Sequence, residues 1–131
     1  MADLVNKPER LAETSRPTSF VADLAAILVF VAIGRSAHKH GVSSSGMLST
    51  AWPFAAGLCC GWILIVLRRM PVTSARSGAI LAVVTVAIGM VLRVIAGQGT
   101  AVAFIGVALA FLGLAMIGWR LILRATNART G

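Results

Sequence analysis

The sequence predicts an all-α integral membrane protein in which four transmembrane helices form a bundle. Of its 131 residues, 58% are hydrophobic and only 12% are charged, whereas about a quarter of a typical soluble domain is charged. The apolar residues gather in four runs, each near the roughly 20 residues that a helix needs to cross a hydrocarbon core of about 30 Å. A soluble chain this short buries too little surface to hide them, so lipid is the expected solvent.

The four runs define one membrane domain, residues 20–123, flanked by the short polar tails 1–19 and 124–131. The first run is marginal in length, because it reaches from Phe20 only to about Ile33, or at most to Ala37. The second run carries the adjacent cysteines, and the third and fourth are almost continuously apolar. The predicted spans are residues 20–37, 48–67, 79–96 and 101–123.

The tryptophans support these limits, because indole rings favour the membrane interface. Trp52 and Pro53 are expected to open the second span at the outer face, where proline costs no helical hydrogen bond. Trp119 is expected at the inner face, with its N–H in the headgroup region. Trp62 lies within the second span and needs a partner that the sequence does not identify.

The distribution of Lys and Arg predicts the orientation. Nine of these residues lie in the N-terminal tail, in the loop between the second and third runs and at the C-terminal end from Arg120 onward, and three lie near the other two loops. Basic loops stay on the cytoplasmic side, so we expect a multi-pass plasma-membrane protein with both tails in the cytoplasm. The alternative is a signal peptide cleaved near Gly34, but Asp23 in its apolar region and three earlier acidic residues argue against cleavage.

Charge and motifs argue against several function classes. The net charge is +8, but the basic residues cluster at the ends of apolar runs without interleaved aromatic residues, so we expect no nucleic-acid binding. No HExxH, GxSxG or Walker motif and no paired carboxylates occur, so the sequence predicts no enzyme, metal or cofactor. Cys59 and Cys60 are adjacent, which suits neither a disulfide nor a metal site.

Small residues are expected to form the helix–helix contacts, because helices in lipid associate through close packing. Gly57 and Gly61 give the second span a GxxxG spacing. Thr85, Gly89 and Arg93 recur every four residues in the third span, so a helix packed at Gly89 should turn Arg93 toward the protein interior. The expected packing stripe of the fourth span comprises Ala103, Gly106, Ala110 and Gly113.

Asp23 lies within a span, where an ionisable residue is a functional hypothesis. It sits about 4–5 Å above the inner end of its helix at a rise of about 1.5 Å per residue, where Ser19 as the cap and the helix dipole favour a carboxylate. Its expected partners are Arg120 or Arg124, because Arg93 lies about 16 Å farther along the membrane normal. We expect a structural role; the alternative is proton coupling, as in small four-helix multidrug transporters.

Arg35, His38 and Arg93 form the candidate binding site at the outer end. They share one level and converge if the first and third spans are neighbours. All four acidic residues, at positions 3, 9, 13 and 23, lie on the inner side. Such an uncancelled cluster predicts a site for a small anion or an anionic lipid headgroup, with a pH response through His38. The alternative is that Arg35 and Lys39 reach lipid phosphates while Arg93 binds loop carbonyl groups such as those of residues 97–99.

Short motifs follow one another along the four spans. They are Asp23, Gly34-Arg35 with His38, Trp52-Pro53-Phe54-x-x-Gly, Gly61-Trp62, Thr85-x-x-x-Gly89-x-x-x-Arg93, Phe104-Ile105 and Gly118-Trp119-Arg120. Together they resemble a family of small prokaryotic membrane proteins, from actinobacteria and some archaea, catalogued as domain of unknown function 3054. The likeness covers roughly residues 20–123. It implies the four-span architecture, carries over no activity, and directs attention to Asp23, Arg35, His38 and Arg93.

Two function classes follow from these observations. In the first, the protein binds or transports a small anion or an anionic lipid headgroup at its outer face. In the second, it is a non-catalytic accessory subunit whose Gly/Ala faces dock onto a second copy or another membrane protein. A polar cavity reaching past the middle of the bilayer would favour transport, and a dry interior would favour the accessory subunit.

Overall fold

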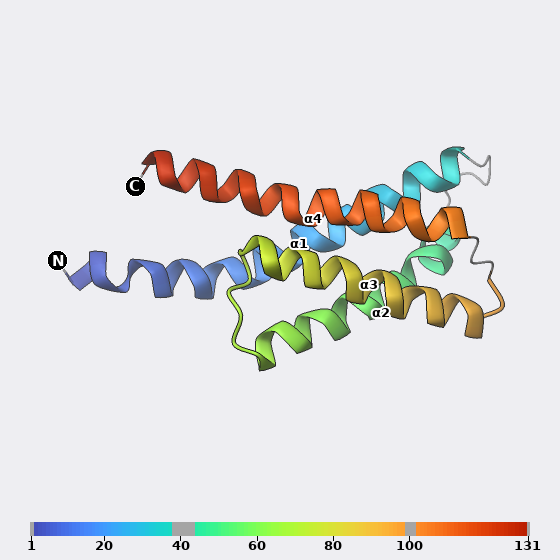
Figure 1. The fold of residues 1–131 in the computed structure, drawn as a ribbon, viewed down its shortest axis with the longest axis horizontal. Coiled ribbons are helices and arrows are strands. Elements are labelled where there is room, and N and C mark those ends of the chain that lie inside the picture. Colours follow the sequence, from blue (N-terminus) through green and yellow to red (C-terminus); the bar gives the residue numbers. More distant parts are fainter. Residues whose placement is uncertain (1, 38–43, 99–101, 131) are drawn as a thin grey trace.

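The predicted spans are four helices in a computed structural model, which describes residues 2–37, 44–98 and 102–130 (Figure 1). Each helix contains a segment that is long and apolar enough to cross a membrane: Arg16–Ser36, Ser45–Leu67, Ala75–Ile95 and Val102–Thr126. The all-α four-span fold is therefore confirmed. The helices are α1 Ala2–Ala37, α2 Ser44–Leu67, α3 Ala75–Ile95 and α4 Val102–Thr130.

The helices extend beyond the predicted spans. Helix α1 begins at Ala2, and α4 continues to Thr130, so both regions predicted as polar tails are largely helical. Helix α3 begins four residues before the predicted limit, because the hydroxyl of Ser74 accepts a hydrogen bond from the Ser77 N–H at 3.1 Å and caps the helix. Figure 1 shows the two termini at the same end of the bundle, with α1 and α4 projecting past the α2–α3 loop.

Pro53 lies inside α2 and not at its start, contrary to the sequence prediction. The helix begins at Ser44, before the predicted residue 48, so Pro53 falls beyond its second turn. Proline has no N–H, so the carbonyl group of Ser49, four residues earlier, receives no hydrogen bond from the helix itself. That carbonyl group faces the candidate site described below.

The helices are arranged in a ring in chain order. Helix α1 packs against α2 and α4, and α3 packs against the same two helices, so among the described residues α1 and α3 face each other across a diagonal. Consecutive antiparallel helices joined by short loops become neighbours, which places every second helix on a diagonal. The first and third spans are therefore not neighbours, although the predicted grouping of their arginines assumed that they were.

Close packing at glycine holds α2 against α3. A Cβ atom on Gly57 would lie 2.6 Å from the backbone oxygen of Thr85, and one on Gly61 would lie 3.0 Å from a methyl group of Leu81. A Cβ atom on Gly89 would lie 2.8 Å from the ring of Phe54. Because such distances are shorter than van der Waals contact, the two helices approach this closely only where glycine is present.

The glycine stripe predicted for the fourth span does not pack inside the bundle. A Cβ atom on Gly106 or Gly113 would meet no atom of the described residues within 4 Å, so among these residues the predicted close crossing is not found. Helix α4 instead turns the fully buried side chains of Ala108, Leu112 and Met116 toward the core. Helix α4 contacts α3 through large side chains, because the glycine at this contact belongs to α3. A Cβ atom on Gly78 would lie 2.9 Å from the Met116 backbone oxygen.

Candidate functional site

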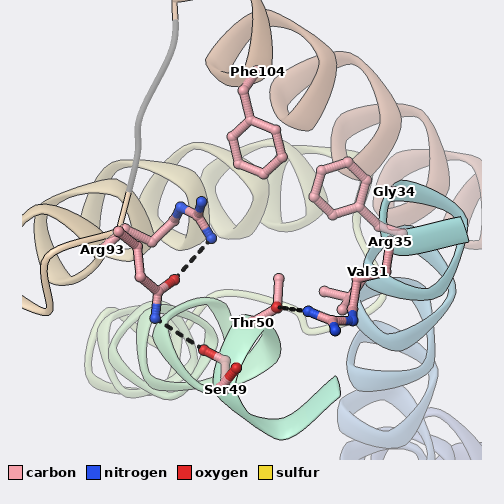
Figure 2. A pocket seen from close by; sticks show the side chains of 9 residues that line it. Val31, Gly34, Arg35, Ser49, Thr50, Arg93 and Phe104 are labelled. Carbon is pink, nitrogen blue, oxygen red and sulfur yellow. Dashed lines mark hydrogen bonds between the residues drawn. The ribbon is translucent and has the colours of Figure 1, made fainter. Parts of the chain in front are cut away.

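A pocket of about 370 Å³ lies at the end of the bundle opposite the two termini (Figure 2). All four helices line it, because each contributes the residues nearest that end. The polar lining comes from both arginines of the predicted site and three uncharged residues, and the rest is apolar or glycine. The lining residues are Phe30, Val31, Gly34, Arg35, Ser49, Thr50, Arg93, Gln98 and Phe104.

The structure brings together two of the three predicted site residues. Arg35 comes from α1 and Arg93 from α3, and both side chains are half-buried. The Nη1 atom of Arg35 donates a hydrogen bond to Thr50 Oγ1 at 3.0 Å. His38, the third predicted residue, lies outside the described residues. Helices α1 and α3 lie across the bundle from each other, but both arginines line the same pocket because their side chains are long.

The end of α3 fixes the position of Arg93. Gly97 has a φ of +78°, and the Gln98 N–H donates to the Arg93 carbonyl oxygen at 2.7 Å, which closes the helix in a Schellman motif. Phe54 packs on Gly89, one turn before Arg93, so α2 covers that face of α3 and Arg93 points to the pocket, as the sequence predicts. Its guanidinium carbon lies 4.8 Å from the centre of the Phe104 ring, a cation–π distance.

Gln98 connects Arg93 to α2. Its Oε1 atom accepts a hydrogen bond from Arg93 Nη1 at 3.0 Å, and its Nε2 atom donates to the Ser49 carbonyl oxygen at 3.1 Å. That oxygen is available because Pro53 supplies no N–H to it. The predicted alternative, in which Arg93 binds carbonyl groups of residues 97–99, is thus realised in part, through the side-chain amide of Gln98.

The pocket contains two positive charges and no carboxylate. No acidic residue follows Asp23 in the sequence, and Asp23 lies 12 residues before Arg35 in α1, or about 18 Å away at about 1.5 Å per residue. Thr50, Ser49 and Gln98 add hydroxyl and amide groups, which bind an oxyanion readily. Within the described ranges no three His, Cys, Asp or Glu residues come together that could hold a metal ion.

Aromatic rings form the floor of the pocket. Phe30 lies 5.7 Å from Phe104 and 5.8 Å from Phe54 between ring centres, and Phe54 lies 6.2 Å from Phe104. Beneath these rings the interior is occupied by fully buried apolar side chains, among them Ile27 and Leu58. The pocket therefore ends at an aromatic layer instead of continuing along the bundle axis.

A second polar cluster, which we call the Asp23 clamp, lies toward the termini. The Asp23 carboxylate accepts two hydrogen bonds from Arg120, from Nη1 to Oδ1 and from Nη2 to Oδ2, each at 2.8 Å. Trp62 Nε1 donates to Oδ2 at 3.0 Å, and Trp119 Nε1 donates to Oδ1 at 2.9 Å. Both charged side chains are fully buried. The carboxylate thus has four donors around it, and the sequence-based pairing with Arg120 is the one observed.

Arg120 extends the Asp23 clamp to the α2–α3 loop. Its Nε atom donates to the Val72 carbonyl oxygen at 2.8 Å, and its Nη1 atom also donates to the Met116 carbonyl oxygen at 2.9 Å. Its guanidinium carbon lies 4.3 Å from the centre of the Trp119 ring. Arg124, the other expected partner of Asp23, is exposed. The clamp therefore ties α1, α2, α4 and one loop together at a single point.

The sequence missed both tryptophans of the Asp23 clamp. Trp119 was expected in the headgroup region, but its N–H binds Asp23, and Trp62 had no identified partner. The pairing of Trp62 with Asp23 could have been found by comparing the depths of the two residues in the membrane. Trp62 lies five residues before Leu67, the end of α2, or about 7.5 Å from that end at about 1.5 Å per residue, which is close to the depth of Asp23.

No curated protein and no solved structure matches the chain. The model of one protein family matches residues 20–123, a range that holds nearly all of the membrane-spanning sequence, the pocket and the Asp23 clamp. This is the range and the family indicated by the motif resemblance, which is confirmed. The chain therefore belongs to the family described as "Protein of unknown function (DUF3054)".

Proposed function

We propose that this membrane protein binds an oxyanion, a phosphate or carboxylate group, between Arg35 and Arg93. One observation carries the proposal: two arginines from diagonally opposed helices line one pocket that no carboxylate shares. Guanidinium groups present planar sets of donors that match phosphate and carboxylate oxygens. An anion between them would offset the repulsion between two half-buried positive charges, which is stronger there than in water.

The contacts around the arginines support binding of this kind. Thr50 and Gln98 hold the two guanidinium groups at the pocket wall through 3.0 Å hydrogen bonds (Figure 2). Side chains already held in place lose less conformational entropy when a ligand arrives. The bonds that position Arg35 and Arg93 therefore favour affinity.

The aromatic floor favours binding over transport. Phe30 and Phe104 line the pocket, Phe54 packs against both rings, and the adjoining core is apolar. A charged ion crossing that layer would lose its hydration without gaining polar partners, which is costly. In this conformation the proposed activity is binding at one end of the bundle.

Removing either pocket arginine is expected to weaken anion binding. A charge-assisted hydrogen bond contributes about 1.5–3 kcal/mol, so Arg35→Gln and Arg93→Gln should each raise the Kd for inorganic phosphate about tenfold or more. Isothermal titration of the full chain in a non-ionic detergent measures this. Arg76→Gln is the matched control, because Arg76 is an exposed arginine at the other end of α3.

The same variants distinguish a free anion from a lipid headgroup. The protein is extracted from vesicles of an anionic phospholipid mixed with a zwitterionic one, and native mass spectrometry then counts retained lipids. Retention of anionic lipid that Arg93→Gln abolishes would identify a headgroup, whereas phosphate binding without retention would identify a free anion. If Arg35→Gln and Arg93→Gln bind phosphate and lipid like Arg76→Gln, the proposed function is wrong.

A second proposal is the accessory subunit, which the outer face of α4 favours. Ala103, Gly106 and Ala110 are exposed along this helix, and no atom of the part of the chain that the structure describes lies within 4 Å of a Cβ atom on Gly106. Small residues on an outer face permit close approach of another helix. The native mass spectra report subunit number too, and a strictly monomeric protein without co-extracted chains would contradict this proposal.

We further propose that both termini lie in the cytoplasm and that the membrane is the plasma membrane. The clustering of basic residues at the end of the bundle that holds the termini supports this orientation. With Cys59 and Cys60 replaced by Ser, a Thr126→Cys variant should react with an impermeant maleimide only after the cells are opened. Labelling of intact cells would reverse the proposed orientation.

A further inference from the structure

The pocket has two chemically different walls. One is polar and contains both arginines with Thr50. The other is apolar and consists of Phe30, Val31 and Phe104. The two walls adjoin directly, because the Arg93 guanidinium lies over the Phe104 ring at 4.8 Å. A bare inorganic anion would contact only the polar wall and would leave water against the aromatic one, which is unfavourable for the apolar surface.

Gly34 leaves open space beside the aromatic wall. It lines the pocket, and a Cβ atom added to it would meet no atom of the described residues within 4 Å. It lies one helical turn after Phe30, so the two residues share a face of α1. The missing side chain leaves a notch that continues the apolar wall toward Arg35.

The size of the pocket exceeds what a small inorganic anion needs. Its volume of about 370 Å³ falls within the range of about 300–1,000 Å³ that is typical of sites for organic small molecules. Such sites combine mostly apolar walls with a few polar groups that fix orientation. Arg35 and Arg93 are the orienting groups here, and the notch at Gly34 with the two rings is the apolar part.

We infer that the ligand is an amphiphilic organic anion: a phosphate or carboxylate group bound by Arg35 and Arg93, joined to a short apolar or aromatic substituent that lies against Phe30 and Phe104. The inference rests on the proposed anion binding and specifies its ligand class. A phosphate monoester fits this description whether it is a soluble metabolite or the end of a lipid.

The first test compares phenyl phosphate with inorganic phosphate on the full chain in a non-ionic detergent. Burying one small ring on the aromatic wall should make phenyl phosphate bind about tenfold more tightly or better. The Arg35→Gln/Arg93→Gln double variant controls for partition of the probe into detergent. It should lose binding of both anions, and unchanged binding of phenyl phosphate to it would overturn the inference.

The second test fills the notch and leaves the arginines in place. Gly34→Leu meets no clash at its Cβ position, since no atom of the described residues lies within 4 Å of it. It should abolish the preference for phenyl phosphate, measured as the ratio of the Kd values of the two anions on the same variant. Gly34→Ala, which fills less of the notch, should retain most of the preference, and unchanged thermal unfolding of both variants verifies the fold.

The outcomes separate the inference from the function on which it rests. Equal affinity of the native chain for both anions, with no effect of Gly34→Leu, would overturn the amphiphilic ligand and leave oxyanion binding intact. Binding of neither anion by the native chain would remove the proposed function and the inference with it. A preference that Gly34→Leu removes while phosphate binding persists supports both.

Discussion

Asp23→Asn is expected to lower the free energy of unfolding by about 3–5 kcal/mol, the usual cost of removing one partner from a buried ion pair. The substitution leaves the Arg120 guanidinium buried without its counter-charge. It also replaces one acceptor oxygen with an NH₂ group that faces the N–H groups of Trp62 or Trp119 and Arg120. Unfolding by sodium dodecyl sulfate in mixed micelles, followed by tryptophan fluorescence, measures the loss.

Two further variants show that the effect belongs to the Asp23 clamp. Arg124→Gln removes an exposed arginine one turn from Arg120 and should change stability by less than about 0.5 kcal/mol. Arg120→Lys keeps the charge but loses the two parallel bonds to the carboxylate, so its effect should fall between those of the other two variants.

The result also bears on the role of Asp23. A carboxylate that accepts four hydrogen bonds and is fully buried is well suited to holding helices together, and we propose that this is its role. Wild-type stability of Asp23→Asn would contradict the structural role and leave proton coupling as the explanation for an acidic residue in the span.

Gly57→Ala is expected to be the most damaging single-methyl addition, with a loss of about 1–3 kcal/mol, as found for overpacked cores. Its Cβ atom would lie 2.6 Å from the Thr85 carbonyl oxygen and 3.1 Å from the Thr85 Cα atom. Both are backbone atoms, so no side-chain rotation relieves the contact and α2 must move away from α3. The same detergent unfolding assay measures the loss.

Gly106→Ala is the matched control, because it adds the same methyl group to a membrane helix where nothing lies within 4 Å. It should be neutral or stabilise by up to about 1 kcal/mol through helix propensity. Gly89→Ala should fall between the two, since its contact at 2.8 Å is with the Phe54 ring, which can shift more easily than backbone. A Gly57→Ala protein as stable as Gly106→Ala would show that the α2–α3 crossing is not as close as described.

The four-helix membrane fold could be predicted because each membrane helix forms from the residues of one continuous segment. An apolar run of about 20 residues satisfies its backbone hydrogen bonds within one helix, so span number and type follow from composition alone. The span limits were less predictable, since capping by Ser74 and continuation of α1 into its polar segment depend on individual contacts and not on hydropathy. For the same reason Pro53 was predicted at the start of α2, whereas it lies inside the helix.

The candidate site was predictable in part. Charge placement indicated that Arg35 and Arg93 gather without an acidic residue, and they line one pocket. The predicted site depended on α1 and α3 being neighbours, whereas the two arginines reach the pocket from helices on opposite sides of the bundle. Gln98, Gly34 and Phe104 were not predicted as site residues, because an amide, a glycine and a phenylalanine carry no charge signal in a membrane sequence.

For this protein the sequence by itself determined four membrane helices, the gathering of Arg35 and Arg93 at one end, and the pairing of Asp23 with a basic residue near the end of the last helix. Only the tertiary structure decided which glycines meet another helix, which tryptophans complete the Asp23 clamp, and that the aromatic layer ends the pocket. The reason is physical: insertion in lipid depends on the composition of each segment, whereas contacts between helices depend on rotation about each helix axis, which packing of all four helices sets together.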